Sequence, residues 1–256
     1  MAPAFGAYAI KKELNIMLPT RKGIKTPVTL LMVFVLASTF GYAMAQTRVE
    51  TAGKTDAASW NFDDVPVGKL PAGWKVAATN QKGPLATWQV VMDKTAPSGE
   101  RVIAMTRPNH TFGGSFNICW TDTVSFLSGE IEVRFKSVKG EEDQGGGVIW
   151  RVHDNENYYI ARFNPLEDNF RIYYVRDGAR KTLASVRVSL PVGKWHTIKI
   201  IQHGNQFEGY LNGKKLLDGT NSLFKKPGGV GLWTKADAVT SFDDFSVRPF
   251  TQKDDK

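Results

Sequence analysis

From residue 46 onward, hydrophobic and polar residues alternate over short segments, and almost no stretch shows the spacing of an amphipathic helix. The segments are rich in Val, Ile, Tyr, Phe, Trp and Thr and are separated by turn residues, which is typical of β-strands. The pattern predicts strands at 87–92, 101–106, 115–120, 129–137, 147–152, 158–163, 169–176, 195–202, 206–211, 230–234 and 240–247.

The turn signals between these segments are sharp. Asp177 with Gly178, Gly204 with Asn205, and above all Asn212 with Gly213 fit tight β-turns. With no linker rich in Pro or Ser after residue 57, we expect one all-β domain, a two-sheet antiparallel jelly-roll sandwich over 58–248. Residues 46–57 would be a short extension and 249–256 a polar tail. A β-propeller is the alternative, but no internal repeat supports it.

The first 45 residues differ from the rest. Five basic residues and one acid precede an apolar run from Val28 to Phe40, and the run is followed by Ala43-Met44-Ala45. This order predicts an export signal cleaved before Gln46, and translation from Met17 would give a signal of ordinary length. An uncleaved membrane anchor is the alternative, because Val28 to Ala45 is about long enough to span a bilayer.

Export changes how the charge of the chain is interpreted. The whole sequence carries a formal net charge of +8, but cleavage after Ala45 leaves 28 basic and 24 acidic residues, a net charge of +4. The basic residues are spread among many strands and matched by acids, so we expect no nucleic-acid partner. We expect a periplasmic or extracellular protein that has no membrane contact once the signal is cleaved. No Cys follows the cleavage site, so a lipoprotein is not expected.

The single cysteine, Cys119, cannot form a disulfide within the chain. It alternates with Asn117 and Thr121 in a predicted strand. We expect it to behave as a small buried apolar residue.

Two predicted strands carry charged faces. Glu130, Glu132 and Arg134 share one face of the segment 129–137, and Arg151 and His153 share one face of 147–152 with its extension. If the two strands pair in a hairpin, carboxylates and cations face each other. Such a face is either a catalytic site or an ordinary ladder of surface ion pairs.

The following segment is dense in side chains that bind sugars. Amides and carboxylates grip vicinal hydroxyls, and aromatic rings stack on the C–H face of a pyranose. The candidate substrate-binding residues are Asn157, Tyr159, Arg162, Asn164, Trp233, Lys235 and Asp237. A polar turn and ordinary packing are the alternative explanations.

These residues resemble a known family. GGGVIWR at 145–151, Asp154-x-x-Asn157-Tyr158-Tyr159, Asn212-Gly213-Lys214, VGLWTKAD at 230–237 and SFDDF at 241–245 are similar to bacterial 3-keto-disaccharide hydrolases. The resemblance covers roughly residues 58–248 and implies a concanavalin A-like lectin/glucanase jelly roll, related to laminin G domains. Hydrolase-like members tend to have Gly-Asn-Ser-Gly before the Arg, whereas this chain has Gln144 and three glycines.

The family 16 glycoside hydrolases share this jelly roll and use Glu-x-Asp-x-x-Glu on one strand. Glu130 and Glu132 match its first two acids, but Phe135 stands where the second catalytic Glu is needed. We therefore do not expect retaining glucanase chemistry through this motif.

If the protein is an enzyme, the resemblance implies cleavage of a 3-keto-glycoside. The keto group acidifies the neighbouring C2–H, so a base can take that proton while the glycosidic oxygen leaves, and water adds afterwards. The candidate catalytic residues are Arg151, His153, Asp154, Glu130 and Glu132. The alternative function is a non-catalytic carbohydrate-binding or cell-envelope module. Convergence of the candidates in one concavity would favour an enzyme.

No cofactor is required, but calcium is a candidate ligand. The pair Asp63 and Asp64 near the start of the domain is repeated as Asp243 and Asp244 near its end. The first and last strands of this fold are usually neighbours. Four carboxylates brought together would suit Ca²⁺, whereas no spacing of His and Cys suggests zinc. The alternative is that these acids face solvent or cap turns.

Overall fold

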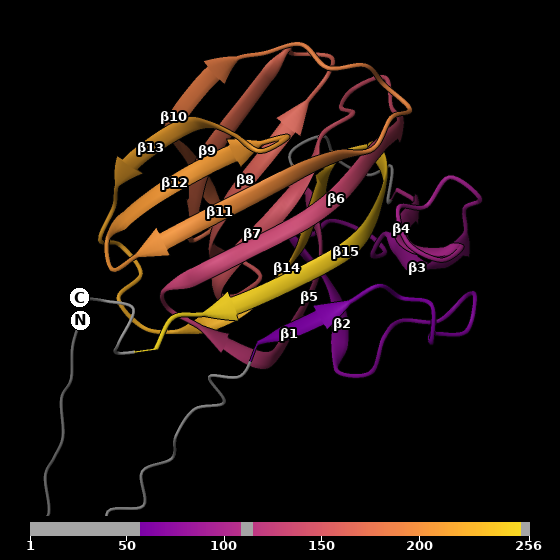
Figure 1. Ribbon diagram of the computed structural model, residues 1–256, viewed down its shortest axis with the longest axis horizontal. Helices are drawn as coiled ribbons and strands as arrows, with labels where there is room; N and C mark the ends of the chain where they lie inside the picture. The colour runs from indigo at the N-terminus through magenta and orange to yellow at the C-terminus, as the bar shows by residue number, and fades with distance from the viewer. Residues whose placement is uncertain (1–56, 109–114, 252–256) are drawn as a thin grey trace, which may run out of the picture. The chain divides into compact units, whose positions relative to one another are not determined.

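The computed structural model describes residues 57–108 and 115–251, and all of them lie in the second of two compact units, Glu50–Lys256. They form fifteen antiparallel strands arranged in two sheets, which confirms the predicted jelly-roll sandwich (Figure 1). The predicted export signal and polar tail lie outside the described residues, apart from 249–251. Within the described part, no helix is long and apolar enough to cross a membrane.

The first sheet has eight strands in the order β13-β12-β11-β6-β15-β4-β3, with β1 also paired to β15. Figure 1 shows β13, β12, β11, β6 and β15 side by side across one layer. The strands are β1 Ala58–Trp60, β3 Thr87–Met92, β4 Arg101–Arg107, β6 Gly129–Lys139, β11 His196–His203, β12 Gln206–Leu211, β13 Lys214–Thr220 and β15 Val239–Pro249.

The second sheet has seven strands in the order β10-β9-β8-β7-β14-β5-β2. Consecutive hairpins build one half of it, from β7 to β10. The strands are β2 Trp74–Thr79, β5 Phe116–Phe126, β7 Gly146–Asp154, β8 Asn157–Asn164, β9 Asn169–Arg176, β10 Ala179–Arg187 and β14 Gly228–Lys235.

The main core lies between the two sheets and follows the alternation of the sequence. In β6, Ile131, Val133 and Phe135 are fully buried, while Glu130 and Glu132 lie on the opposite face. Cys119 is also buried in this core, as expected, and burial raises the pKa of its thiol.

A second apolar cluster covers the outer face of the seven-stranded sheet, where a simple sandwich would meet solvent. It contains Trp233 of β14 and Tyr158 of β8, both fully buried. The tips of two hairpins reach across this face to the end of β2, because the Tyr158 hydroxyl lies 2.6 Å from Thr79 Oγ1 and Asn80 Nδ2 donates to Gly178 O at 2.9 Å. The sheet therefore curls, and its central strands β7, β8 and β14 are buried on both faces.

β6 and β7 do not pair in a hairpin. β6 pairs with β11 and β15, whereas β7 lies in the other sheet. The opposite charges that face β6 come instead from its true neighbours, and Arg248 forms an ion pair with Glu130 at 3.0 Å. Four strands lie outside the predicted set, namely β1, β2, β10 and β13.

The Asn212–Gly213 turn joins β12 and β13 as a tight hairpin. Both residues have positive φ, 50° and 78°, the conformation that the Asn-Gly pair favours. Asn212 Oδ1 also accepts the amide of Thr197 at 2.9 Å, so the turn is tied to β11.

Candidate functional site

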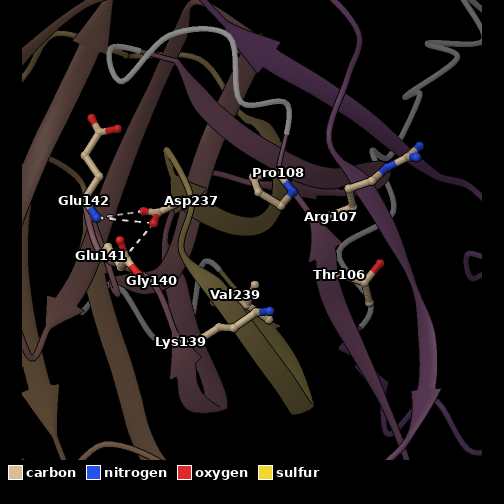
Figure 2. Close-up of a pocket in the computed structure, with 9 residues that line it drawn as sticks. All are labelled: Thr106, Arg107, Pro108, Lys139, Gly140, Glu141, Glu142, Asp237 and Val239. Atoms are coloured by element: carbon tan, nitrogen blue, oxygen red, sulfur yellow. Dashed lines mark hydrogen bonds between the residues drawn. The ribbon is translucent and has the colours of Figure 1, made fainter.

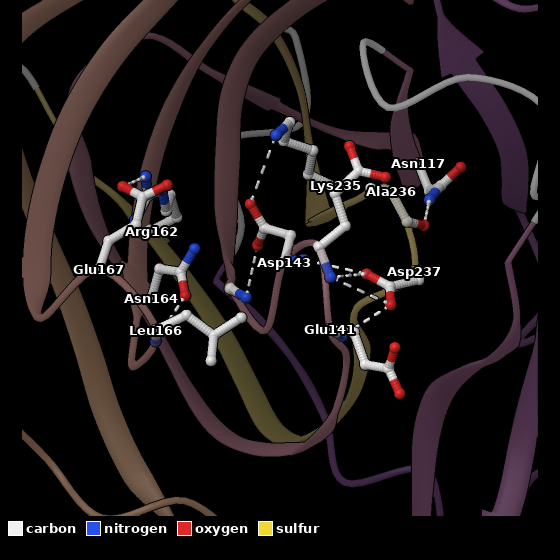
Figure 3. Close-up of polar contacts among 12 residues, drawn as sticks. Asn117, Glu141, Asp143, Arg162, Asn164, Leu166, Glu167, Lys235, Ala236 and Asp237 are labelled. Atoms are coloured by element: carbon white, nitrogen blue, oxygen red, sulfur yellow. Dashed lines mark hydrogen bonds and ion pairs between the residues drawn. The ribbon is translucent and has the colours of Figure 1, made fainter.

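The loop between β6 and β7, residues 140–145, carries the chain from one sheet to the other. Asp237, in the turn between β14 and β15, holds this loop by accepting the backbone amides of Glu141 at 2.7 Å, Glu142 at 3.0 Å and Asp143 at 2.9 Å (Figure 3). Burial acts to raise the pKa of Asp237, but these amides outweigh it and the pKa is lowered. Asp237 therefore positions the loop as an ionised carboxylate.

Gly140 begins the loop with φ of 152°. A Cβ at this position would lie 1.8 Å from the carbonyl oxygen of Asp143, so only glycine allows the chain to fold back on itself here.

Asp143 is a buried carboxyl at the centre of the loop, with an exposed fraction of 1%. Its Oδ1 accepts the amide of Gly145 at 2.6 Å, and its Oδ2 lies 3.7 Å from Lys235 Nζ (Figure 3). Burial raises the pKa of Asp143, although Arg162 and Lys235 act to lower it. Asp143 was not among the residues predicted from the sequence.

Arg162 lies beside this group and is also buried, with an exposed fraction of 1%. It donates to Glu167 at 2.8 Å, to Asn169 at 2.7 Å and to the hydroxyl of Tyr173 at 3.0 Å. Burial acts to raise the pKa of Glu167, but the hydrogen bonds from Asn169 and Arg162 bring it down to about 2. Asn164, at the end of the same strand, uses its side-chain oxygen to cap the amide of Leu166.

A cleft of about 690 Å³ lies on the other side of the loop. In Figure 2, Glu141, Glu142 and Asp237 lie to one side and Thr106 and Arg107 to the other. The remaining lining residues are Pro108, Lys139, Gly140 and Val239. A cavity of this volume is within the usual range for small-molecule sites. It therefore has room for a small saccharide and presents both carboxylates and cations.

Arg151 has a structural role. It lies near the end of β7 that is farther from the cleft. Its guanidinium is buried and donates to three backbone carbonyls, those of Leu127, Phe224 and Gly204. These carbonyls belong to three separate loops. Arg151 has a positive φ of 47° at a break in the strand register, which turns its side chain toward them.

His153 and Asp154 follow Arg151 and lie away from the cleft. His153 is exposed and lines a different hollow, of about 350 Å³, together with Trp120 and Lys226. Asp154 caps its own turn by accepting the amide of Glu156 and the side-chain amide of Asn157.

The two aromatic candidates are part of the protein interior. Trp233 has an exposed fraction of 0% and packs against Phe116, so it offers no free face to a sugar as placed. Tyr159 stacks on Trp150 with ring centroids 5.5 Å apart, and its hydroxyl donates to Asn221 at 2.7 Å.

Glu130 and Glu132 lie on the outer face of the eight-stranded sheet, so they do not converge with Arg151 and His153 in one concavity. Of the predicted residues, the structure brings together Arg162, Asn164, Lys235 and Asp237 around the loop 140–145.

The first and last strands are neighbours, as predicted, because β1 pairs with β15. Asp63 accepts the amides of Glu100 and Arg101, and Asp243 and Asp244 both bond Ser98. Asp64 lies in a turn next to Asp63. Among residues 57–108 and 115–251, no group of three or more acidic, His or Cys side chains is placed to hold a metal ion, and calcium here stays a prediction.

The curled two-sheet sandwich with a polar cleft at one end defines a protein of the concanavalin A-like jelly-roll class. Residues 61–248 match the model of the 3-keto-alpha-glucoside-1,2-lyase-like domain, and the chain belongs to this family. The resemblance seen in the sequence is thus confirmed, and membership supports a sugar-related role. No curated protein matches the chain.

Solved structures show the same fold. The carbohydrate binding module CBM66 from Bacillus subtilis is 20% identical and has a TM-score of 0.53, with 68% of this chain and 93% of that chain covered. A β-glucanase from Bacillus licheniformis is 14% identical and has a TM-score of 0.52, with 76% of this chain and 98% of that chain covered.

Proposed function

We propose that this protein is exported and acts on a 3-keto-glycoside bound in the cleft beside the loop 140–145. One observation carries the proposal. The cleft is lined by the acids Glu141 and Glu142 and by the bases Arg107 and Lys139, in a chain of the 3-keto-alpha-glucoside-1,2-lyase-like family.

The cleft holds the groups that elimination requires. The reaction removes the C2 proton to a carboxylate, places the negative charge on the C3 oxygen, and then breaks the C1–O bond to release the alcohol and leave an unsaturated ketone. Glu141 and Glu142 are the cleft's base and acid, one taking the C2 proton and the other protonating the leaving oxygen. Arg107 or Lys139 stabilises the enolate oxygen. Addition of water to the double bond completes net hydrolysis.

The second candidate function is a non-catalytic carbohydrate-binding module. It is favoured by the dispersal of Arg151, His153, Glu130 and Glu132, which the sequence had suggested as one catalytic group. Such a module needs the polar cleft but no proton transfer.

Two measurements test the enzyme and the binding module. The protein is incubated with a panel of 3-keto-disaccharides and their parent glycans, and the turnover of each sugar and the thermal shift of the protein are measured. We expect turnover by the unaltered protein and loss of turnover in Glu142→Gln and Arg107→Met. Glu132→Gln is the matched control, because Glu132 lies on the outer face of β6, away from the cleft. Thermal shift without turnover would select the binding module, and absence of both would overturn both functions.

Export is tested separately. Expression of the full chain in a bacterial host and N-terminal sequencing of the periplasmic and secreted fractions should give a mature chain that starts at Gln46. An intact chain in the membrane fraction would show the anchor instead.

A further inference from the structure

The hollow of about 350 Å³ that His153 lines lies where β7 ends and β14 begins. The loop 140–145 precedes β7 and Asp237 follows β14, so the cleft is at the other end of both strands. β14 has eight residues and a strand rises about 3.3 Å per residue, which puts about 25 Å between the hollow and the cleft. The hollow is therefore a separate place on the molecule.

Three neighbouring strand pairs lose their regular register around this hollow. β14 shifts against β5 between Gly228 and Val230 and against β7 between Gly229 and Val230, and β7 shifts against β8 between Trp150 and Asp154. Bulges are over-represented beside functional sites, because they redirect side chains from the regular faces of a sheet. The hollow thus coincides with irregular backbone in the interior of the sheet, where regular pairing is expected.

The buried residues that line the hollow are apolar or lack a side chain. Trp120, Val124 and Val152 have exposed fractions of 9%, 6% and 3%, and Gly229 is also buried. A Cβ on Gly229 would lie 2.8 Å from the ring of Trp120, so glycine lets the indole pack directly against β14. These residues give the hollow an apolar floor.

The rim of the hollow is mostly polar, with the exposed side chains of Asp122, His153 and Lys226. Asp122 supplies acceptors. Its carboxylate pairs with Lys75 at 2.7 Å, and Lys75 Nζ also lies 3.9 Å from the ring centroid of Trp120. These two contacts hold the Asp122 carboxylate beside the floor.

His153 and Lys226 supply donors to the same rim. β14 lies between β5 and β7, so His153 stands on the opposite side of β14 from Asp122. His153 Nε2 lies 3.3 Å from Lys226 O, and its ring meets Phe224 edge-on with centroids 5.2 Å apart, which orients the imidazole. Within the described part of the chain, no carboxylate forms an ion pair with Lys226. Its ammonium group is therefore available to a ligand.

We propose that this hollow is a second saccharide site, which binds a short neutral oligosaccharide outside the cleft. A pyranose has apolar C–H faces and a periphery of hydroxyls, so it needs apolar surface together with donors and acceptors. The floor supplies the apolar surface, and Asp122, His153 and Lys226 supply the polar groups. A neutral sugar fits better than an acidic one, because the carboxylate of Asp122 repels an anion.

The size of the hollow also favours a short ligand, because its volume is at the lower end of the range for small-molecule sites. The position of the site does not depend on the proposed function. The choice of a sugar rests on the sugar-related role of the family.

Calorimetry of the purified protein with maltotetraose, cellotetraose and laminaritetraose tests the site, and inorganic phosphate serves as an anion probe. We expect at least one tetrasaccharide to bind, and its affinity to fall about tenfold in Lys226→Met and in His153→Phe, which each remove a hydrogen-bond donor. Both positions are exposed, and phenylalanine keeps the ring contact with Phe224. Lys225→Met is the matched control, because this neighbouring lysine is exposed but does not line the hollow.

Unchanged affinity in both hollow variants would show that the oligosaccharide binds elsewhere and would overturn the inference. An equal loss in Lys225→Met would reduce the effect to general charge and would overturn it too, as would absence of binding by all three tetrasaccharides. Phosphate that binds more tightly than every tetrasaccharide would indicate an anion site instead. Turnover of a 3-keto-disaccharide without tetrasaccharide binding would sink this site alone and leave the proposed function standing.

Discussion

Replacing Arg151 and measuring both stability and activity shows whether this residue has a structural or a catalytic role. Its guanidinium donates to Leu127 O at 2.9 and 2.6 Å and to Phe224 O at 2.7 Å, and it also contacts Gly204 O. Gly204 O keeps a second donor, the side-chain amide of Gln202 at 3.0 Å, so two carbonyls would lose their side-chain donor in Arg151→Ala.

An unpaired buried carbonyl costs about 1–3 kcal/mol, and the space left by the side chain adds to this. We therefore expect Arg151→Ala to lower the free energy of unfolding by about 3–5 kcal/mol. Because the residue has a φ of 47°, Arg151→Gly should be about 1 kcal/mol less harmful than Arg151→Ala, since glycine adopts this conformation without strain.

The assay is urea denaturation of the three proteins, followed by tryptophan fluorescence, with activity measured on the folded fraction. A variant that unfolds at the wild-type urea concentration would refute the structural reasoning. Loss of activity at full stability would instead support the catalytic role that the sequence suggested for Arg151.

Three further predictions concern other parts of the fold. Burial raises the pKa of Asp243 to about 6, above its unfolded value near 3.8, so the folded state holds the proton more tightly. Stability should then fall as pH rises from about 4 to about 6, and urea titrations across this range should show a flatter profile for Asp243→Asn. Cys119 should resist iodoacetamide in the native protein and react after unfolding, as mass spectrometry can show; rapid native labelling would contradict its burial. Gly213→Ala should cost about 1 kcal/mol in thermal or chemical unfolding, because a φ of 78° strains alanine although nothing lies within 4 Å of the added Cβ.

β6 and β12 are among the strands that the sequence predicted correctly, and each has one face in the main core. In β6 and β12 the alternation is clean because one side of each strand is apolar and the other is polar. The missed strands β10 and β13 are edge strands with many partly exposed residues, so their composition carries little alternation. β1 has only three residues, too few to show a period.

The candidate site was harder to predict, because it depends on which strands become neighbours. A hairpin of β6 and β7 would bring the carboxylates of one strand opposite the cations of the other, whereas the loop between them crosses to the other sheet. Asp143 lies in that loop among glycines and acids, and no local pattern marks it as buried. Trp233 lies in the second apolar cluster, and no local pattern in the sequence indicates that distant hairpin tips would cover it.

The curl of the seven-stranded sheet has a consequence for backbone protection. β7 and β14 are central strands whose two faces are both covered, by the main core on one side and by the second cluster on the other. Their amides can exchange with solvent only when the hairpin tips lift away from β2 or when the whole domain opens. In deuterium exchange, these two strands should be the last to lose protection, long after the edges β10 and β13.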